Sequence, residues 1–407
     1  MLPIPAVQGG AVENLIDFYL EYNDKHHLHD ITVYSPWGPK VSNHPALASK
    51  FNHYIYIDVT SLKARIERRI YKYFQSPKNY YNYFIEYYFE KAYSKLKNAN
   101  YDYIIIENGA GLAYKLSRRG HHNLILHLHN DLLNATSRYH DEIFNGLQAI
   151  LTCSDYIKNK VLTIDPNSSK VQTLYNAIDV SNFLRHNALK IKRQDLGISN
   201  NDFVIVYSGR INKDKGVSEL IDAILLLKDK PDIKLMIIGG TFYGNEGNEN
   251  EFVRSLKEKA KILQDRIFFT GFVPYNHIPS YLKLADIAVL PSMWDEPFGL
   301  TIVEALAAGL PLITTRSGGI PEICEGVATI VSRDGVVRHL ADAILNLYEH
   351  PDRRNYIASI SVERALRFDK ENYAKRLLEF LQDLMLATQE RESQFNKKAI
   401  FRQEKEN

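Results

Sequence analysis

Short apolar runs separated by longer amphipathic segments recur along the whole chain. In the amino-terminal half these runs lie at residues 30–34, 54–58, 101–106, 123–128, 148–153 and 170–174. They restart at residues 202–207, 234–238, 267–270, 286–291 and 312–315. Runs of this length are typical of buried strands, and strands that alternate with helices predict an α/β fold with parallel sheets covered on both faces. Ligands of such sheets bind at the carboxyl ends of the strands.

The strand pattern is interrupted by a polar and basic stretch at about residues 181–201. We therefore predict two domains, at residues 1–180 and 181–366, followed by a helix at 367–387 and a charged tail at 388–407 that frays. The first domain opens with Gly9-Gly10 and an amphipathic helix, so that only Met1 and Leu2 remain to supply a first strand. We expect either that this strand is cut short or that the native chain starts upstream.

Residues 291–322 place two glutamates around a turn from a strand into a helix. Glu296 lies in the loop after the run at 286–291, and Glu304 lies in the first turns of the helix that opens near Gly299. The backbone amides of residues 298–301 have no partner inside that helix and so form a cradle for an anion. Carboxylates beside such a cradle indicate a ligand that carries hydroxyl groups as well as phosphates, as nucleotide-sugars do. The alternative is a solvated loop acid and an exposed helix acid.

A second turn from a strand into a helix, residues 208–216, carries two cations. Arg210 and Lys215 can neutralise a diphosphate there without a metal ion. Because the chain contains no Asp-x-Asp pair, it lacks the usual carboxylate clamp for a divalent ion, and we predict neither a metal nor a cofactor. Phe272, just after the run at 267–270, is placed to offer backbone groups to a base. The alternative for Arg210 and Lys215 is a solvated loop.

Two histidines, His127 and His129, flank Leu128 at the end of a predicted strand. Strand geometry turns both side chains to one face, where the chain leaves the sheet. The pair could form half of a metal site, but the sequence does not indicate an acid that would complete it. A single histidine at the cleft that donates to a sugar hydroxyl or to the forming bond is the more economical interpretation.

The helical region at residues 62–101 is basic and rich in tyrosine and phenylalanine. Its cations outnumber Glu67, Glu86 and Glu90; they are Lys63, Arg65, Arg68, Arg69, Lys72, Lys78, Lys91, Lys95 and Lys97. A basic, aromatic helical face suits an anionic membrane surface or a lipid-diphosphate acceptor. The alternative is a pair of ordinary domain helices with their cations in water, and nucleic acid binding is a poorer third reading.

Composition excludes several other classes of protein. The net charge of +2 gives no bulk attraction to nucleic acid, and the two cysteines, Cys153 and Cys324, form no CxxC pair. We therefore expect a reducing, cytoplasmic environment without disulfides. No apolar run approaches the roughly 20 residues that span a bilayer, so any membrane contact is expected to be peripheral, at the inner face.

The turn at 208–216 and the stretch at 286–325 resemble the motifs of family 4 glycosyltransferases, which are retaining enzymes of the GT-B type. The resemblance extends over nearly the whole chain, from Gly9-Gly10 to about residue 386. It implies two Rossmann-like domains that face each other across a cleft, with the donor on the second domain and the acceptor on the first. The helix at 367–387 would cross back to the first domain. Ala177 departs from the glycine that the family usually has at this position.

The resemblance also implies roles for individual residues. Arg210 and Lys215 would hold the donor diphosphate, Glu304 the ribose hydroxyls, and Glu296 the hydroxyls of the transferred sugar. The backbone amides that complete the cradle would be those of Gly299, Leu300 and Thr301. On the first domain, His129 would lie under the sugar and Gly10 would face the diphosphate.

The function that the resemblance implies is transfer of a sugar from a nucleotide-diphosphate-sugar, with retention at the anomeric carbon. We expect a UDP-sugar as donor and a glycan or lipid-linked glycan as acceptor, in the biosynthesis of a capsular, extracellular or cell-wall polysaccharide. Competing interpretations are a nucleotide-sugar epimerase or sugar phosphorylase of the same fold, and a non-catalytic sugar-binding partner subunit.

Overall fold

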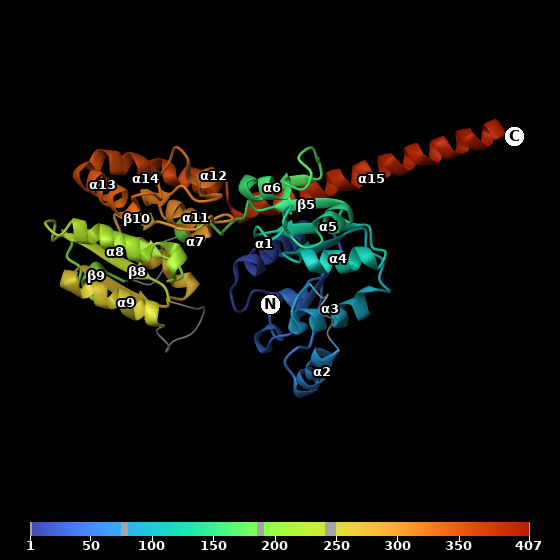
Figure 1. Cartoon of the computed structure of the whole chain (residues 1–407), viewed down its shortest axis with the longest axis horizontal. Helices are drawn as coiled ribbons and strands as arrows, with labels where there is room; N and C mark the ends of the chain where they lie inside the picture. The colour runs from blue at the N-terminus through green and yellow to red at the C-terminus, as the bar shows by residue number, and fades with distance from the viewer. Residues whose placement is uncertain (1, 75–79, 185–190, 241–249, 407) are drawn as a thin grey trace.

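The chain folds into two α/β lobes, and the backbone passes from one lobe to the other twice (Figure 1). The computed structural model describes residues 2–74, 80–184, 191–240 and 250–406, with the backbone alone at residue 264 and over 391–406. The loop at 241–251 that the sequence marks as rich in glycine and asparagine lies largely outside the described residues. Cys153 and Cys324 are buried free thiols, as expected for a chain without disulfides.

The amino-terminal lobe is built on two parallel sheets. One has the order β3-β4-β5-β6, and the other pairs β1 with β2. The strands are β1 Ile31–Pro36, β2 Asn52–Ile57, β3 Ile104–Glu107, β4 Leu124–Leu128, β5 Ala149–Thr152 and β6 Val171–Thr173. The helices are α1 Ala11–His26, α2 Leu62–Tyr73, α3 Tyr83–Leu96, α4 Ala110–Arg118, α5 His140–Asn145 and α6 Asp155–Val161, and the short helix that follows, α7 Ser181–Leu184, lies in the carboxyl-terminal lobe (Figure 1). Strands β4 and β5 are buried along their whole length, which is why they read as continuous apolar runs.

The division of this lobe into two sheets was not predicted from the apolar pattern. No described residue before α1 lies in a strand, and side chains rather than a ladder hold this segment against the β1–β2 pair. Ile4 donates its amide to Ser35 Oγ at 2.8 Å, and its carbonyl accepts from the Tyr56 hydroxyl at 3.0 Å. Between the sheets, the hydroxyls of Tyr34 and Tyr101 lie 2.9 Å apart. Side-chain contacts thus join the sheets where no strand pairs them.

The carboxyl-terminal lobe contains one six-stranded parallel sheet with the order β12-β11-β10-β7-β8-β9. Its strands are β7 Phe203–Ser208, β8 Ile233–Ile238, β9 Ile267–Gly271, β10 Ile287–Leu290, β11 Leu312–Thr315 and β12 Thr329–Val331. The helices are α8 Val217–Leu226, α9 Glu251–Ala260, α10 Ile278–Leu282, α11 Leu300–Ala307, α12 Ile320–Cys324, α13 Val336–Glu349 and α14 Pro351–Leu366. Short 3-10 turns occur in both lobes. In the amino-terminal lobe they are η1 Pro39–Val41 and η2 Pro45–Ala48, and later in the chain they are η3 Arg193–Leu196, η4 Lys213–Lys215, η5 Lys261–Arg266 and η6 Tyr275–His277. The sequence pattern missed β12, which is short and half-buried, and α14, which buries few residues.

The last helix returns to the amino-terminal lobe, as the resemblance implied (Figure 1). Helix α15 Lys370–Glu406 packs Tyr373, Leu377 and Leu381 against a cluster that includes Leu15 of α1 and Leu151 of β5. The chain does not leave this helix at residue 388, where a frayed tail was expected. The Thr388 hydroxyl lies 3.0 Å from Gln148 Nε2, and the backbone stays helical to Glu406. Glu, Gln, Lys and Arg are good helix formers, which agrees with a helical backbone in this charged segment, and fraying of the tail stays a prediction.

Candidate active site

Arg210, Lys215 and Glu296 follow two strands of the carboxyl-terminal sheet, at the point where the strand order switches from one side of β7 to the other. From β7 the chain adds β8 and β9 on one side, and then crosses to β10 on the other. Arg210 and Lys215 follow β7, and Glu296 follows β10, so neighbouring strands bring them together. In open parallel sheets the loops beyond such a switch point diverge and leave room for a ligand.

Lys215 and Glu296 form an ion pair across this switch point. The Lys215 ammonium donates to Glu296 Oε1, which also accepts from the Ser292 hydroxyl at 2.8 Å. The backbone fixes the two loops together, since the Met293 amide donates to the Asp214 carbonyl at 2.7 Å. Both side chains are largely buried, and the Lys215 ammonium lies 5.6 Å from the centre of the Trp294 ring. The Lys215–Glu296 ion pair is therefore supported by the hydrogen bond from Ser292 and by the backbone hydrogen bond between the two loops.

The anion cradle was predicted at the start of α11. Gly299 precedes the helix with φ 119°, a conformation that favours glycine, and it carries no capping side chain. The amides of Leu300 and Thr301 are the first two of the helix and have no carbonyl four residues earlier within it. The side chain of Arg210, after β7, is exposed, and the backbone carbonyl of Arg210 accepts a hydrogen bond from the buried Tyr207 hydroxyl at 2.8 Å. A helix tip and an exposed guanidinium thus lie on the same edge of the sheet.

Glu304 is a buried acid one turn into the same helix. Its side chain is 7% exposed, and burial raises its pKa to about 7, although the hydrogen bond from the Tyr275 hydroxyl acts in the opposite direction. The sequence did not predict Tyr275, which lies in η6 after β9. Its neighbours along the chain give no sign that it contacts Glu304 in a helix that follows β10. Phe272 lies in the same connection, with a side chain that is 40% exposed. The carboxyl group of Glu304 can accept from a ligand hydroxyl in the place of Tyr275.

Gly10 begins α1 on the amino-terminal lobe with φ 114°. A Cβ atom added there would meet Glu13 Oε2 at 2.2 Å and Leu2 Cδ1 at 2.9 Å, so the position accepts only glycine without movement. Glu13 therefore lies against the turn that was expected to face a diphosphate. The role of Gly10 stays a prediction.

His129 lies at the end of β4 with a partner at each ring nitrogen. Its Nε2 is 3.0 Å from Glu107 Oε2, and its Nδ1 is 2.8 Å from Asn176 Oδ1. Burial, followed by the neighbouring His127, lowers the pKa of His129, which favours the neutral ring. A neutral ring has one proton and donates to one oxygen, so Asn176 must then turn its NH2 group toward Nδ1. Contact with a sugar hydroxyl requires His129 to give up one of these partners.

Glu107, at the end of β3, is the acid that the sequence did not reveal beside the two histidines. His127 Nδ1 is 3.1 Å from Glu107 Oε2, and the ligand atoms of Glu107, His127 and His129 all lie within 4.8 Å of one another. Burial acts to raise the pKa of Glu107, but the charge and hydrogen bonds of His127 and the hydrogen bond of His129 hold it well below its ordinary value. His127 Nε2 is buried without a partner in the described structure, so this ring lacks the outer hydrogen bond that usually supports a metal ligand. As it stands, the group is a hydrogen-bonded triad of one buried and two partly buried side chains.

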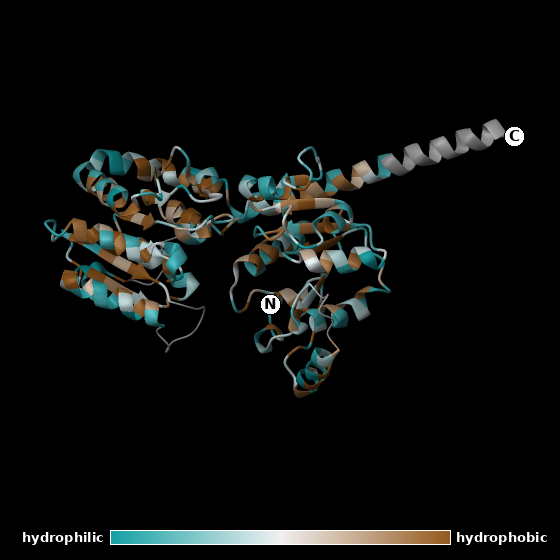
Figure 2. Ribbon diagram, viewed as in Figure 1, coloured by the Kyte–Doolittle hydropathy of each residue, from teal (hydrophilic) through white to brown (hydrophobic). Residues whose placement is uncertain are grey.

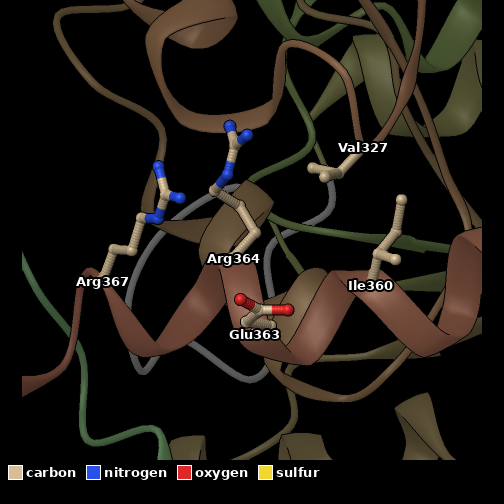
Figure 3. A pocket seen from close by; sticks show the side chains of 5 residues that line it. All are labelled: Val327, Ile360, Glu363, Arg364 and Arg367. Atoms are coloured by element: carbon tan, nitrogen blue, oxygen red, sulfur yellow. The ribbon is translucent and has the colours of Figure 1, made fainter.

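A separate pocket lies on the carboxyl-terminal lobe and contains none of the predicted site residues. Arg364 of α14 and Arg367, which follows the helix, lie side by side at its edge, with Glu363, Ile360 and Val327 (Figure 3). Arg364 Nη1 donates to the Ile323 carbonyl at 3.0 Å, which ties α14 to α12. The pocket belongs to the packing of these helices.

Comparison with known proteins agrees with this geometry. Residues 190–363 match the family model described as glycosyl transferases group 1. The chain is 29% identical to "Putative glycosyltransferase YtcC" of Bacillus subtilis (strain 168) over 342 residues, 81% of this chain and 76% of that protein. It is 27% identical to spore coat protein SA of the same organism over 376 residues, 89% of each.

A solved structure shows the same fold over almost the whole length. Anabaena HepE, crystallised with UDP and glucose, superposes with a TM-score of 0.65 at 21% identity, covering 92% of this chain and 96% of that one. The family match lies on the lobe that carries Arg210, Lys215, Glu296 and Glu304, and the fold match extends to both lobes. Residues 190–363 therefore match the glycosyl transferases group 1 family, and the two lobes together have the GT-B fold.

Proposed function

We propose that this chain is a retaining glycosyltransferase of the family 4 type that transfers a sugar from a UDP-sugar to a glycan or lipid-linked glycan. The observation that carries the proposal is the set of charges at the switch point of the carboxyl-terminal sheet. Lys215, Arg210 and the tip of α11 offer positive charge to a diphosphate. Glu296 and Glu304 beside them offer acceptors for hydroxyl groups. The UDP bound to the structural neighbour supports the choice of donor.

In the proposed reaction the bond from the anomeric carbon to the diphosphate oxygen breaks, and the acceptor oxygen bonds to that carbon on the same face. The acceptor hydroxyl gives its proton to the leaving phosphate oxygen. Lys215 and Arg210 stabilise the charge that develops on the diphosphate, so that electrostatics does most of the work. Glu296 orients the sugar while it balances Lys215, and His129 forms the floor of the site. We propose that no metal ion takes part.

The acceptor and pathway belong to the same proposal. Spore coat protein SA and a lipopolysaccharide N-acetylglucosaminetransferase of Salmonella typhimurium are among the relatives, the latter 25% identical over 255 residues. They support a role in building a capsular, extracellular or cell-wall polysaccharide in the cytoplasm. We place the acceptor at the inner face of a membrane, with the region at 62–101 as the point of peripheral contact. No nucleic acid is involved.

Substitution of Lys215 by alanine tests the proposal. We expect turnover with the native donor to fall by about 100- to 1000-fold, because the leaving diphosphate loses a preorganised cation. The donor is first identified by a thermal-shift screen with UDP-, GDP-, ADP- and dTDP-sugars, since a ligand of the folded state raises Tm. The anomeric proton coupling of the product, measured by NMR, reports retention.

Lys213→Ala is the matched control, because Lys213 is an exposed cation in the same turn. It should keep turnover within about threefold of wild type. Equal activity of Lys215→Ala and wild type, or a product of inverted configuration, would refute the mechanism.

A further inference from the structure

Helix α2 presents an apolar stripe to solvent at helical spacing. The side chains on it are Leu62, Ile66, Ile70 and Tyr73, with Phe74 at the helix end, and they are 76%, 51%, 53%, 87% and 82% exposed. Residues three and four apart share one face of a helix, so these five form a continuous surface. Large exposed apolar patches mark sites of interaction.

The opposite face of α2 already has its partners. Ala64 is the buried residue of the helix, and Arg68 donates to the Val59 carbonyl while its guanidinium lies 4.6 Å from the centre of the Phe84 ring. Glu67 is held by Lys91 at 2.6 Å and by the Tyr87 hydroxyl at 2.8 Å. The apolar stripe is therefore left over after α2 has packed against α3.

The charges that remain exposed on α2 are positive. Lys63, Arg65, Arg69 and Lys72 are exposed, whereas Glu67, the acid within the helix, is engaged by α3. Helix α3 does not share this character, because Tyr87 and Phe89 are buried in the core. Of the region at 62–101, α2 is therefore the part that carries the expected basic, aromatic face. It lies at the far end of the amino-terminal lobe (Figure 1). Apolar and polar residues lie side by side along it (Figure 2).

We infer that α2 is an interfacial helix that docks the amino-terminal lobe onto an anionic lipid bilayer. The stripe enters the region between headgroups and acyl chains, Tyr73 and Phe74 anchor its end, and the four cations face anionic headgroups. A second copy of this chain is a poorer occupant, since it would bring the same four cations against each other. The inference rests on the membrane acceptor of the proposed function and assigns its contact surface to one helix.

Sedimentation with vesicles tests the inference on the full chain. The vesicles contain phosphatidylcholine and phosphatidylglycerol in a roughly two-to-one ratio, and pure phosphatidylcholine serves for comparison. We expect binding to the anionic vesicles, a loss of at least about tenfold in affinity for Ile66→Ser/Ile70→Ser, and a weaker salt dependence for Arg65→Gln/Arg69→Gln. Ile262→Ser removes an isoleucine that is 70% exposed on the other lobe and should change nothing.

Donor hydrolysis without an acceptor separates this inference from the proposed function. It should be equal in wild type and Ile66→Ser/Ile70→Ser, which also shows that the variant is folded. Wild type that hydrolyses donor but ignores anionic vesicles would overturn the inference and leave the proposed function standing. Vesicle binding without any donor turnover would support the inference and overturn the proposed function. A wild-type dimer in sedimentation velocity that the double variant abolishes would assign the stripe to a second copy and overturn the inference.

Discussion

At the scale of single residues, the two carboxyl groups of the site differ in their partners. Glu296 is compensated by Lys215, whereas buried Glu304 has the Tyr275 hydroxyl as its hydrogen-bond partner and a pKa raised to about 7 by burial. A ribose hydroxyl is bound more strongly by a carboxylate than by a neutral carboxyl group. Donor affinity should therefore rise as the pH increases through about 7.

The same shift has a consequence for stability. The folded-state pKa of Glu304 is raised above the ordinary 4.5, so its protonated form favours the fold, and this contribution is lost as the pH rises from about 4.5 through about 7. Relative to Glu304→Gln, wild type should thus lose about 2 to 3 kcal/mol of unfolding free energy between pH 5 and pH 8. Urea unfolding of both proteins at the two pH values measures this difference. Glu325→Gln, an exposed acid, is the control, and a pH-independent difference for Glu304→Gln would contradict the assignment.

At the scale of elements, glycine turns hold the loops that carry the charged residues. Gly318 has φ 55°, and a Cβ atom there would lie 2.2 Å from the Glu296 carbonyl oxygen and 2.7 Å from the Glu296 amide nitrogen. Gly319 donates its amide to the same carbonyl at 2.8 Å. The turn before α12 therefore positions the backbone of Glu296, which places its side chain on Lys215.

Gly318→Ala and Gly326→Ala separate backbone strain from this steric contact. Both positions have positive φ, but a Cβ atom at Gly326 meets nothing within 4 Å. We expect Gly326→Ala to cost about 1 kcal/mol of stability and to keep activity. Gly318→Ala should cost more and reduce turnover at least about tenfold, because Glu296 must move. Steady-state kinetics and thermal unfolding of both variants measure these effects, and equal kinetics would show that the turn does not position Glu296.

At the scale of the whole molecule, the two lobes meet through the start of α6. The carboxylate of Glu322 in α12 accepts the amides of Asp155 at 2.6 Å and Tyr156 at 2.7 Å, and the Ser154 hydroxyl donates to the Pro297 carbonyl at 2.6 Å. Next to this contact, the two segments that link the lobes run parallel to each other at Ile178 and Asp369, and the Lys370 amide donates to the Ile178 carbonyl at 2.9 Å. One residue of the carboxyl-terminal lobe thus caps a helix of the other.

Glu322→Ala should loosen the contact between the lobes. Two helix-terminal amides lose their acceptor, so hydrogen exchange at Asp155 and Tyr156 should speed up by about tenfold or more while the cores of both lobes stay protected. Glu325→Ala removes an exposed acid of the same lobe that pairs with Arg316 and is the matched control. Unchanged exchange at both amides in Glu322→Ala would mean that other contacts hold the lobes together.

The sequence by itself determined the strands of both lobes apart from β12, and the loops that carry the site, because apolar runs and turn residues act over a few neighbouring positions. It identified Lys215 and Glu296 separately, and His127 with His129. Only the tertiary structure decided that Lys215 meets Glu296, 81 residues away, or that Glu107 completes the histidine pair. These contacts depend on which strands are neighbours and on where crossing helices pack, and such long-range choices leave no periodic trace in the sequence. The same holds for α2 and α3, which lie in one basic, aromatic stretch of the sequence although packing buries aromatic side chains of α3 and leaves the apolar face of α2 exposed.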